Sequence, residues 1–405
     1  MRVSARKSWL LVILVCILAS VLALGIFGCG GSSTGTTTAG GASGTPLVIA
    51  AAIGLTGDAA SGDVPLSLAM QYSVDTLNKN GGIAGHPVKL LIKDMKSDPA
   101  LGATVADQLL GQGADIMVGP AFPGMAVGVI QAAAAKGVAV LGGVSAQPEY
   151  VKVGGAKAYL VAFGDNVQAA AMADYALKQG YKTVYTLVSP DLSYTAKLPV
   201  FFDQVFAKGG GKEIGTDTFS VGQTDFSAQV TKIAGLNPKP DCIYTGMFTP
   251  DVGTFLKQLR AAGVNLPLLG SDGDDQQALI DFAGKAAENV TFTTHGYASP
   301  GSELATYVAG FTAWNKGKPP EANAFAGLGG DCIDVIKAAV EAAGSVDPKA
   351  IATALSNIEN LKVETGSITY KGTDGVPLKT VSIVAIENGK FVLKDQHIPA
   401  FIPTP

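Results

Sequence analysis

Histidine, cysteine and charged side chains are scarce in this sequence of 405 residues. It has three histidines and four cysteines, and charged residues make up 15% of the chain. His86, His295 and His397 are scattered without the spacing of zinc ligands, and they are few candidates for a general base. No Walker loop, His-Glu-x-x-His motif or nucleophile elbow between a strand and a helix is present. We therefore expect no metal, no cofactor and no enzymatic activity.

Basic residues are also too few for a nucleic-acid surface. The chain contains 29 Lys and Arg against 33 Asp and Glu, and no basic stripe stands out, which argues against nucleic acid as a partner. Residues 1–28 hold three of the basic side chains and none of the acidic ones, so the remainder has 26 basic against 33 acidic residues, a net charge of −7. Those 377 residues exceed one ordinary domain and suit two.

The N-terminus has the layout of a secretory signal. Arg2, Arg6 and Lys7 form a short basic region, and Trp9 to Phe27 follow as 19 residues without a charge. A run of this length could also cross a bilayer and remain as an anchor. Hydropathy alone leaves both interpretations open.

The end of this run favours cleavage and lipidation. Ile26-Phe27-Gly28-Cys29 resembles a bacterial lipobox, in which the cysteine is lipidated and becomes the new N-terminus. Residues 30–46 are almost only Gly, Ser, Thr and Ala, a composition that cannot bury enough apolar surface to fold. We predict a signal peptide over 1–28, lipidation at Cys29, and a flexible tether over 29–45 that holds a domain outside the cytoplasm, close to a bacterial membrane.

Apolar runs then alternate with amphipathic stretches. Strands are expected at 47–53, 88–93, 116–118 and 138–141, and helices at 65–78, 99–112 and 124–136. Asp98 is expected to cap the helix that Pro99 begins. This alternation predicts a parallel sheet that is covered by helices on both faces.

The pattern restarts after an extended segment at 159–162. Helices are expected at 167–179, 198–208, 226–234 and 250–262, and strands at 183–188, 215–220, 242–245, 268–269 and 290–294. Helices at 303–316, 326–343 and 348–358 precede strands at 367–370, 380–387 and 390–393. Asn388-Gly389 is typical of a hairpin turn with positive φ. The fold class is therefore α/β, with two lobes of similar design.

Loops that follow these strands are the candidate binding segments, because open parallel sheets bind ligands beyond the carboxyl ends of their strands. With two lobes face to face, the ligand belongs in the cleft between them. The loop 119–124 leads into a helix whose first N–H groups favour an anion, and the loop 142–148 presents a hydroxyl at Ser145. Both loops could equally be turns without a ligand.

Two further loops have a double interpretation. Tyr194, after the strand at 183–188, lines a pocket or caps a helix. Asp272, Asp274 and Asp275 form either a solvated acidic loop or a site for a cation or an ammonium group.

Several motifs resemble a known family. Asn78-Lys79-Asn80-Gly81-Gly82-Ile83-Ala84-Gly85, Ile116-Met117-Val118-Gly119-Pro120 and Leu259-Arg260-Ala261-Ala262-Gly263 are similar to segments of the leucine-isoleucine-valine-binding proteins. These are type I periplasmic binding proteins of amino-acid ABC transporters, and the resemblance extends over about 47–395. It implies two doubly wound parallel-sheet lobes joined by three crossovers. Lobe 1 would combine 46–164 with 295–371, and lobe 2 would combine 165–294 with 372–397.

The resemblance also implies a ligand site, beginning with the groups that hold a carboxylate. One loop aligns with Phe122, Pro123, Gly124 and Met125, where Pro123 stands in place of a typical serine. Proline offers neither a hydroxyl nor an N–H, so the backbone groups of Gly124 and Met125 must serve. The second loop aligns with the segment Val144-Ser145-Ala146, in which Ser145 could replace the threonine that is familiar at the position of Ala146.

The other half of the implied site is acidic and aromatic. Asp272 aligns with the acidic partner of the ligand's ammonium group, which favours the cation interpretation of that loop. Tyr194 and Phe248 align with aromatic residues that cover the ligand.

The resemblance implies an extracytoplasmic, lipid-anchored and monomeric solute-binding protein of an ABC transporter, with a membrane permease as partner. Its ligand would be an amino acid or a related small carboxylate or amide. A sensor that presents its ligand to a membrane receptor or kinase is the alternative, and an extracellular enzyme is a third. Cys242 and Cys332 either pair or, as we favour, are two buried small hydrophobic side chains.

Overall fold

The computed structural model describes residues 42–405 apart from Ala156. The predicted signal peptide, Cys29 and nearly all of the predicted tether lie outside the described residues. None of the helices within the described part combines the length and the apolarity that a membrane span requires.

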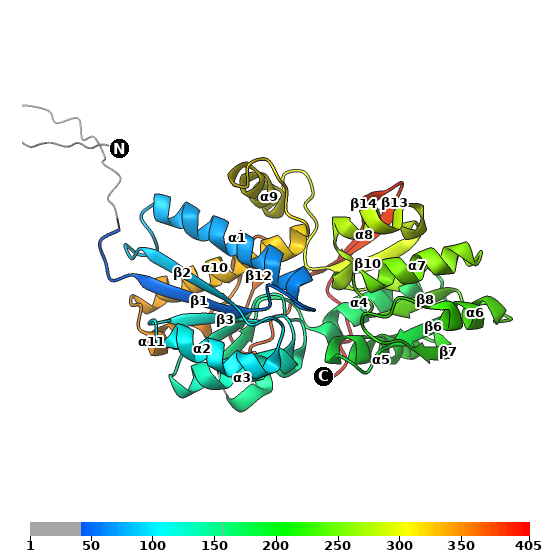
Figure 1. Ribbon diagram of the computed structural model, residues 1–405, viewed down its shortest axis with the longest axis horizontal. Helices are drawn as coiled ribbons and strands as arrows, with labels where there is room; N and C mark the ends of the chain where they lie inside the picture. The colour runs from blue at the N-terminus through cyan, green and yellow to red at the C-terminus, as the bar shows by residue number, and fades with distance from the viewer. Residues whose placement is uncertain (1–41, 156) are drawn as a thin grey trace, which may run out of the picture. The chain divides into compact units, whose positions relative to one another are not determined.

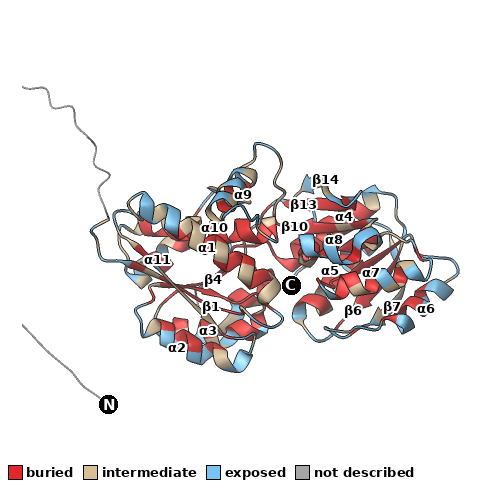
Figure 2. Ribbon diagram, turned by 45° about the horizontal axis from the view of Figure 1, so that its top comes forward, coloured by how far each residue is buried: buried red, intermediate tan, exposed pale blue. Residues whose placement is uncertain are grey.

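Lobe 1 is built on a five-stranded parallel sheet with the order β2-β1-β3-β4-β5. The strands are β1 (Leu47–Ile53), β2 (Val88–Asp94), β3 (Ile116–Gly119), β4 (Val140–Gly142) and β5 (Ala158–Leu160). The inner strand β1 is buried along almost its whole length, which fits its near-continuous run of apolar residues. Figure 2 shows buried strands inside both sheets, whereas the edge strands are more exposed.

Helices from two separate stretches of the chain cover this sheet (Figure 1). They are α1 (Ala60–Lys79), α2 (Gly102–Leu110), α3 (Pro123–Ala135), α9 (Glu303–Trp314), α10 (Asn323–Ala343) and α11 (Pro348–Leu355). Helix α1 packs along α10, and α2 packs along α3 on the other face. A short hairpin of β11 (Leu361–Val363) and β12 (Gly366–Ile368) follows α11.

Lobe 2 is built on a seven-stranded sheet with the order β14-β13-β10-β9-β8-β6-β7. The strands are β6 (Thr183–Val188), β7 (Lys212–Thr218), β8 (Cys242–Thr245), β9 (Leu268–Gly270), β10 (Val290–Thr294), β13 (Val381–Glu387) and β14 (Lys390–His397). Strands β6 to β10 are parallel to one another, and β13 and β14 add an antiparallel hairpin at one edge. The predicted turn is confirmed, because Asn388 and Gly389 both have positive φ.

The helices of lobe 2 are α4 (Asp165–Lys178), α5 (Ser193–Lys208), α6 (Ser227–Gly235), α7 (Asp251–Ala261) and α8 (Gln277–Ala283). The chain passes between the two sheets three times, after β5, after β10 and before β13. The predicted fold class, two doubly wound lobes joined by three crossovers, is confirmed. The exact lobe limits at 164, 294 and 372 stay a prediction.

Helices α1 and α5 begin about five residues earlier than predicted, because each contains a proline that looked like a start or a break. Helix α5 begins at Ser193 rather than 198 and continues through Pro199, and α1 begins at Ala60 and contains Pro65. Proline cannot donate to the carbonyl four residues earlier. In α5 the Thr195 carbonyl that Pro199 leaves free accepts the N–H of Ser189 at 3.4 Å. The loop N–H therefore replaces the hydrogen bond that Pro199 cannot make, and the helix continues through the proline.

Other local predictions were close. Asp98 caps its helix as predicted, accepting the N–H of Ala100 at 2.9 Å. Strand β7 was predicted at 215–220, but it begins at Lys212 and ends at Thr218. As an edge strand it is largely exposed, so its apolar pattern is weak. Cys242 and Cys332 are buried and unpaired, as we favoured.

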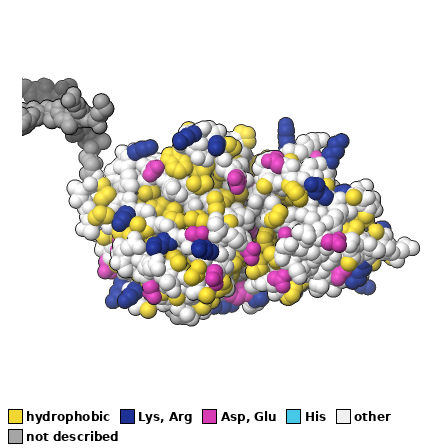
Figure 3. Space-filling model, viewed as in Figure 1, with side chains coloured by type: hydrophobic (Ala, Val, Ile, Leu, Met, Phe, Trp, Pro, Cys, Tyr) yellow, Lys and Arg dark blue, Asp and Glu magenta, His cyan; other side chains and the backbone are white. Residues whose placement is uncertain are grey.

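The surface that is visible in Figure 3 carries acidic and basic side chains side by side, with apolar side chains between them. An aromatic group joins α1 and α9 in lobe 1: the partly buried Tyr72 of α1 packs edge-on against the buried Tyr307 and Phe311 of α9. Trp314 completes this group and donates its indole N–H to Asp75 at 2.9 Å. These contacts attach α9 to the body of lobe 1.

Candidate ligand-binding cleft

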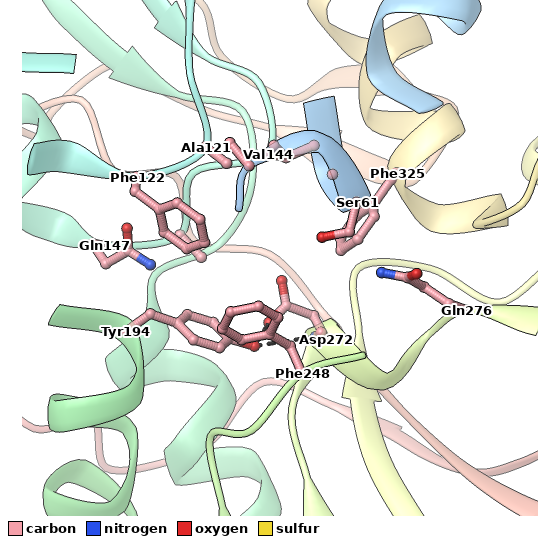
Figure 4. A pocket seen from close by; sticks show the side chains of 14 residues that line it. Ser61, Ala121, Phe122, Val144, Gln147, Tyr194, Phe248, Asp272, Gln276 and Phe325 are labelled. Carbon is pink, nitrogen blue, oxygen red and sulfur yellow. Dashed lines mark hydrogen bonds between the residues drawn. The ribbon is translucent and has the colours of Figure 1, made fainter. Parts of the chain in front are cut away.

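A cavity of about 450 Å³ opens between the two lobes, at the carboxyl ends of the strands of both sheets. This volume includes space that is open to solvent. Its lining residues come from both lobes: Ala59, Ser61, Gly62, Ala121, Phe122, Val144, Ala146, Gln147 and Phe325 from lobe 1, and Tyr194, Phe248, Asp272, Gly273 and Gln276 from lobe 2. Figure 4 shows the labelled side chains around this space.

Each lining residue stands at a strand-to-helix junction or at the start of a helix. In lobe 1, Ser61 is at the start of α1, Phe122 is the N-cap residue of α3, and Phe325 is in the first turn of α10. In lobe 2, Tyr194 is the second residue of α5, and Asp272 begins the short 3₁₀ turn after β9. The doubly wound topology brings these junctions together although they are far apart in the sequence.

Aromatic side chains form much of the wall. The ring of Phe122 from lobe 1 lies 6.5 Å from the ring of Tyr194 and 6.2 Å from that of Phe248, between centroids, and Tyr194 and Phe248 are also 6.2 Å apart. These are the distances of edge-to-face and tilted aromatic contacts. The three rings therefore form one apolar contact between the lobes, and a ligand would rest beside it.

Asp272 is the one acidic or basic side chain among the residues that line the cavity. Three protein donors hold its carboxylate. Oδ1 accepts the hydroxyl of Tyr194 at 2.7 Å and Nε2 of Gln168 at 2.8 Å, and Oδ2 accepts Nε2 of His295 at 2.9 Å. Charge-assisted hydrogen bonds of this kind are strong and fix the direction of a carboxylate.

The acidic loop is not solvated, so that interpretation of it is wrong. Asp272, Asp274 and Asp275 are 4%, 0% and 7% exposed. Burial raises the pKa of Asp275 to about 6, and burial with the charge of Asp272 raises the pKa of Asp274 well above its usual value. Burial acts in the same direction on Asp272, but hydrogen bonding and charge from His295, then hydrogen bonds from Tyr194 and Gln168, hold its pKa below the usual value. A single ionised carboxylate therefore faces the cavity.

Six of the ten predicted ligand residues line the cavity: Phe122, Val144, Ala146, Tyr194, Phe248 and Asp272. Pro123, Gly124, Met125 and Ser145 are not among the lining residues. The N–H of Met125 is already donated to the carbonyl of Phe122 at 3.0 Å, because Phe122 precedes the first turn of α3. The hydroxyl of Ser145 is buried without a hydrogen-bond partner. The binding role of all ten residues stays a prediction.

Sequence reasoning missed several lining residues. Ser61 and Phe325 lie at helix starts that the predicted helices did not reach, since those began at 65 and 326. Gln147 belongs to a loop that was singled out for its hydroxyl rather than for its amide. Gln276 follows the acidic loop directly. Their positions could have indicated them, because each of these residues lies within a few residues of a strand end or a helix start.

Comparisons with known proteins agree with this architecture. A family model described as periplasmic binding protein matches residues 46–390, so this chain belongs to the periplasmic binding protein family. The Leu/Ile/Val-binding protein BraC3 of Rhizobium johnstonii is 30% identical over 342 residues, which are 84% of this chain and 91% of that protein.

Solved structures share the fold. The crystal structure of the leucine-binding protein LivK of Thermotoga maritima superimposes with a TM-score of 0.78 at 26% identity, covering 87% of this chain and 99% of that one. A solute-binding protein of an ABC transporter from R. palustris, solved in complex with benzoate, superimposes with a TM-score of 0.76 at 21% identity, covering 88% of this chain and 98% of that one.

Proposed function

We propose that this chain is the extracytoplasmic, lipid-anchored solute-binding protein of an ABC transporter. Its ligand would be an amino acid or a related small carboxylate or amide, held in the cavity between the lobes. The observation that carries this proposal is the cavity itself, which combines aromatic walls from both lobes with one buried carboxylate. Relatives described as Leu/Ile/Val-binding proteins support the ligand class.

In this proposal the two lobes bind opposite ends of the ligand. Asp272 meets an ammonium group from lobe 2, and Tyr194, Phe248 and Phe122 cover the side chain. The carboxylate or amide end faces lobe 1, at the loops 122–125 and 144–146. The Met125 N–H is used within α3, which leaves the Gly124 backbone and the unpartnered Ser145 hydroxyl as donors, and because neither lines the cavity, the ligand reaches them only if these loops turn toward it.

Transport requires that the ligand change the relation of the two lobes. A ligand that touches both lobes binds the closed arrangement more tightly than the open one, and only this difference in affinity can shift the equilibrium between them. A membrane permease would then recognise the closed form. The protein acts as a monomer in this scheme, since one chain supplies both walls of the cavity.

The ligand proposal is tested by calorimetry on the purified chain with amino acids, their amides and small aromatic acids. We expect at least one compound to bind and to raise the melting temperature. For a ligand with an ammonium group, Asp272→Asn should weaken binding about 10- to 100-fold, because a charged hydrogen bond is lost. An unchanged affinity would remove the ammonium role, and no binding across the series would reject the ligand class.

The anchor is tested separately, because it rests on Cys29 alone. We expect mass spectrometry of the chain isolated from membranes to show a lipid on Cys29 as the first residue. Cys29→Ser should release the protein from the membrane fraction. Recovery of an uncleaved chain that begins at Met1 would reject the lipid anchor and favour a retained N-terminal segment.

A further inference from the structure

Buried carboxyl groups crowd the lobe 2 side of the cavity. Asp165, Asp272, Asp274 and Asp275 are all at most 7% exposed, and the charge of Asp272 raises the pKa values of the other three. No Lys or Arg lies among the residues that line the cavity. Keeping one carboxylate ionised among three other buried carboxyl groups requires a specific donor, since burial disfavours charge.

His295 is that donor. Its Nε2 lies 2.9 Å from Asp272 Oδ2, and its side chain is fully buried. Of the groups that lower the pKa of Asp272 against the effect of burial, the hydrogen bond from His295 is the largest and its charge follows. Tyr194 and Gln168 both bind the other oxygen, so His295 alone holds Oδ2.

The ring of His295 is held in place by an aromatic contact. Its centroid lies 3.9 Å from that of Phe163, at an interplanar angle of 33°. Phe163 precedes the first crossover, and His295 directly follows β10 at the second. The ring's other nitrogen, Nδ1, is buried without a hydrogen-bond partner. The orientation of the imidazole therefore comes from Phe163 and Asp272 rather than from a second hydrogen bond.

One acceptor position of Asp272 remains for a ligand. A carboxylate offers about four acceptor positions, and the three protein donors use two on Oδ1 and one on Oδ2. The side chain of Asp272 reaches into the cavity in Figure 4, between Phe248 and Ser61. The donor set thus leaves room on the same oxygen that His295 binds.

We propose that His295 is a positioning residue that keeps the Asp272 carboxylate charged and directed into the cavity, so that the pocket selects ligands carrying an ammonium group. This rests on the proposed function. His295 acts through Asp272 and needs no contact with the ligand. His295 also connects Asp272, the proposed partner of the ligand's ammonium group, to two crossovers. Its ring contacts Phe163, which precedes the first crossover, and its backbone lies at the second.

The test separates the hydrogen bond from the ring contact. His295→Phe keeps a ring against Phe163 but cannot donate, whereas His295→Gln places an amide N–H near the position of Nε2. His397→Phe is the matched control, since His397 lies on β14 and its nearest carboxylate is that of Asp395, with Nδ1 3.3 Å from Oδ2. The probes are leucine with 4-methylpentanoate and phenylalanine with 3-phenylpropanoate, pairs that differ only in the ammonium group.

For wild type we expect the amino acid of at least one pair to bind more tightly than its deaminated partner. His295→Phe should reduce that preference about 10- to 100-fold by lowering the affinity for the amino acid and not that for its deaminated partner. This is the size expected for loss of a charged hydrogen bond. His295→Gln should restore most of the preference, and His397→Phe should leave it unchanged. Loss of folding alone would weaken both members of a pair equally, which the melting temperature of each variant checks.

The outcomes distinguish the two proposals. If a pair binds and His295→Phe keeps the wild-type preference, or if both variants lose affinity for both members equally, the role of His295 is overturned while the binding function stands. If the deaminated partners bind as tightly as the amino acids to wild type, the ammonium selection is overturned as well. If neither amino acids nor their analogues bind, the proposed function fails and the inference fails with it.

Discussion

Each lobe holds a buried carboxyl group that is bound by one cationic or protonatable donor at a crossover, and the two clusters around these groups differ in what they face. In the lobe 1 cluster, Lys379 from the crossover before β13 donates to Asp331 at 3.0 Å and to Thr365 at 2.6 Å, and none of the three lines the cavity. In lobe 2, His295 donates to Asp272, which does line it. We therefore expect the lobe 1 cluster to contribute to stability and, under the proposed function, the lobe 2 cluster to bind the ligand.

The partners of the two clusters explain this difference. The three ammonium protons of Lys379 go to Asp331, to the Thr365 hydroxyl and to the carbonyl of Val161, and the other oxygen of Asp331 accepts the N–H of Thr365 at 3.1 Å. A histidine that donates through Nε2 leaves acceptor capacity on Asp272. A cluster whose donors and acceptors are all paired lowers the free-energy cost of burying its charges. A carboxylate with a free acceptor position, as on Asp272, can still accept a hydrogen bond from a small molecule.

The largest effect is expected from the lobe 1 pair. Lys379→Met should destabilise the protein by about 3 to 5 kcal/mol, because it leaves Asp331 as an unpaired buried charge. Ligand affinity at a temperature where the variant is folded should match wild type. Urea unfolding and calorimetry measure the two quantities.

Lys371→Met is the matched control, since its ion pair with Glu359 is exposed and should contribute less than about 1 kcal/mol. If Lys379→Met lost ligand affinity without losing stability, the distinction between the two clusters would be contradicted, because the lobe 1 cluster would then contribute to ligand binding.

A smaller effect concerns pH. Burial, then the charges of Asp334, Asp331 and Glu303, raise the pKa of Glu364 to about 8. Because the pKa is raised on folding, the stability that Glu364 contributes is present below its unfolded pKa of about 4.5 and is lost as pH rises through about 8.

Glu364→Gln should therefore be more stable than wild type at about pH 9, by about 1 to 2 kcal/mol after allowing for its partial exposure, and equal to it at about pH 4. Urea unfolding across this range measures the difference. Glu341→Gln, on an exposed part of α10, is the control. A constant difference at all pH values would contradict the electrostatic cause.

The smallest effect is expected where the lobes meet. Lys197 of α5 forms an ion pair with Glu149 of lobe 1 across the cleft, and both side chains are partly exposed. Lys197→Met should weaken ligand binding by no more than about fivefold, and less at high salt, because exposed pairs contribute about 0.2 to 1 kcal/mol.

The pair of Lys178 with Asp395 lies within lobe 2 and has similar exposure, so Lys178→Met should leave affinity unchanged. Titration calorimetry at two salt concentrations measures both variants. Equal effects of the two substitutions would show that contact between the lobes does not contribute to binding.

Most of the fold could be predicted because its signals are local. The limits of the strands at 47–53, 183–188 and 290–294 agree with the prediction, since each is rich in β-branched, aliphatic or aromatic residues. The hairpin at Asn388-Gly389 and the cap at Asp98 follow from the residues themselves. The helix starts at Ala60 and Ser193 could not be placed, because both helices contain a proline, and in α5 the carbonyl that Pro199 leaves free is satisfied by the N–H of Ser189, outside the helix.

Only part of the candidate site could be predicted from the sequence. Asp272 and the aromatic residues were found through a family resemblance. The burial of the acidic loop and the partner of Asp272 depend on contacts between distant residues: Gln168 bonds Asp272 104 positions away and Thr293 125 positions away. His295 carries no local sign of its role, since a single histidine after a strand is typical of many core positions.

The two cysteines of the described part bear on how motion of the lobes can be observed. Cys242 lies in lobe 2 and Cys332 in lobe 1, both fully buried, and burial raises the pKa of the Cys242 thiol to about 12 and that of Cys332 further. A thiol kept protonated in this way reacts slowly with maleimide dyes. Cysteines introduced on the surface of each lobe could therefore be labelled selectively, and energy transfer between two dyes would follow closure of the cleft in an otherwise native chain.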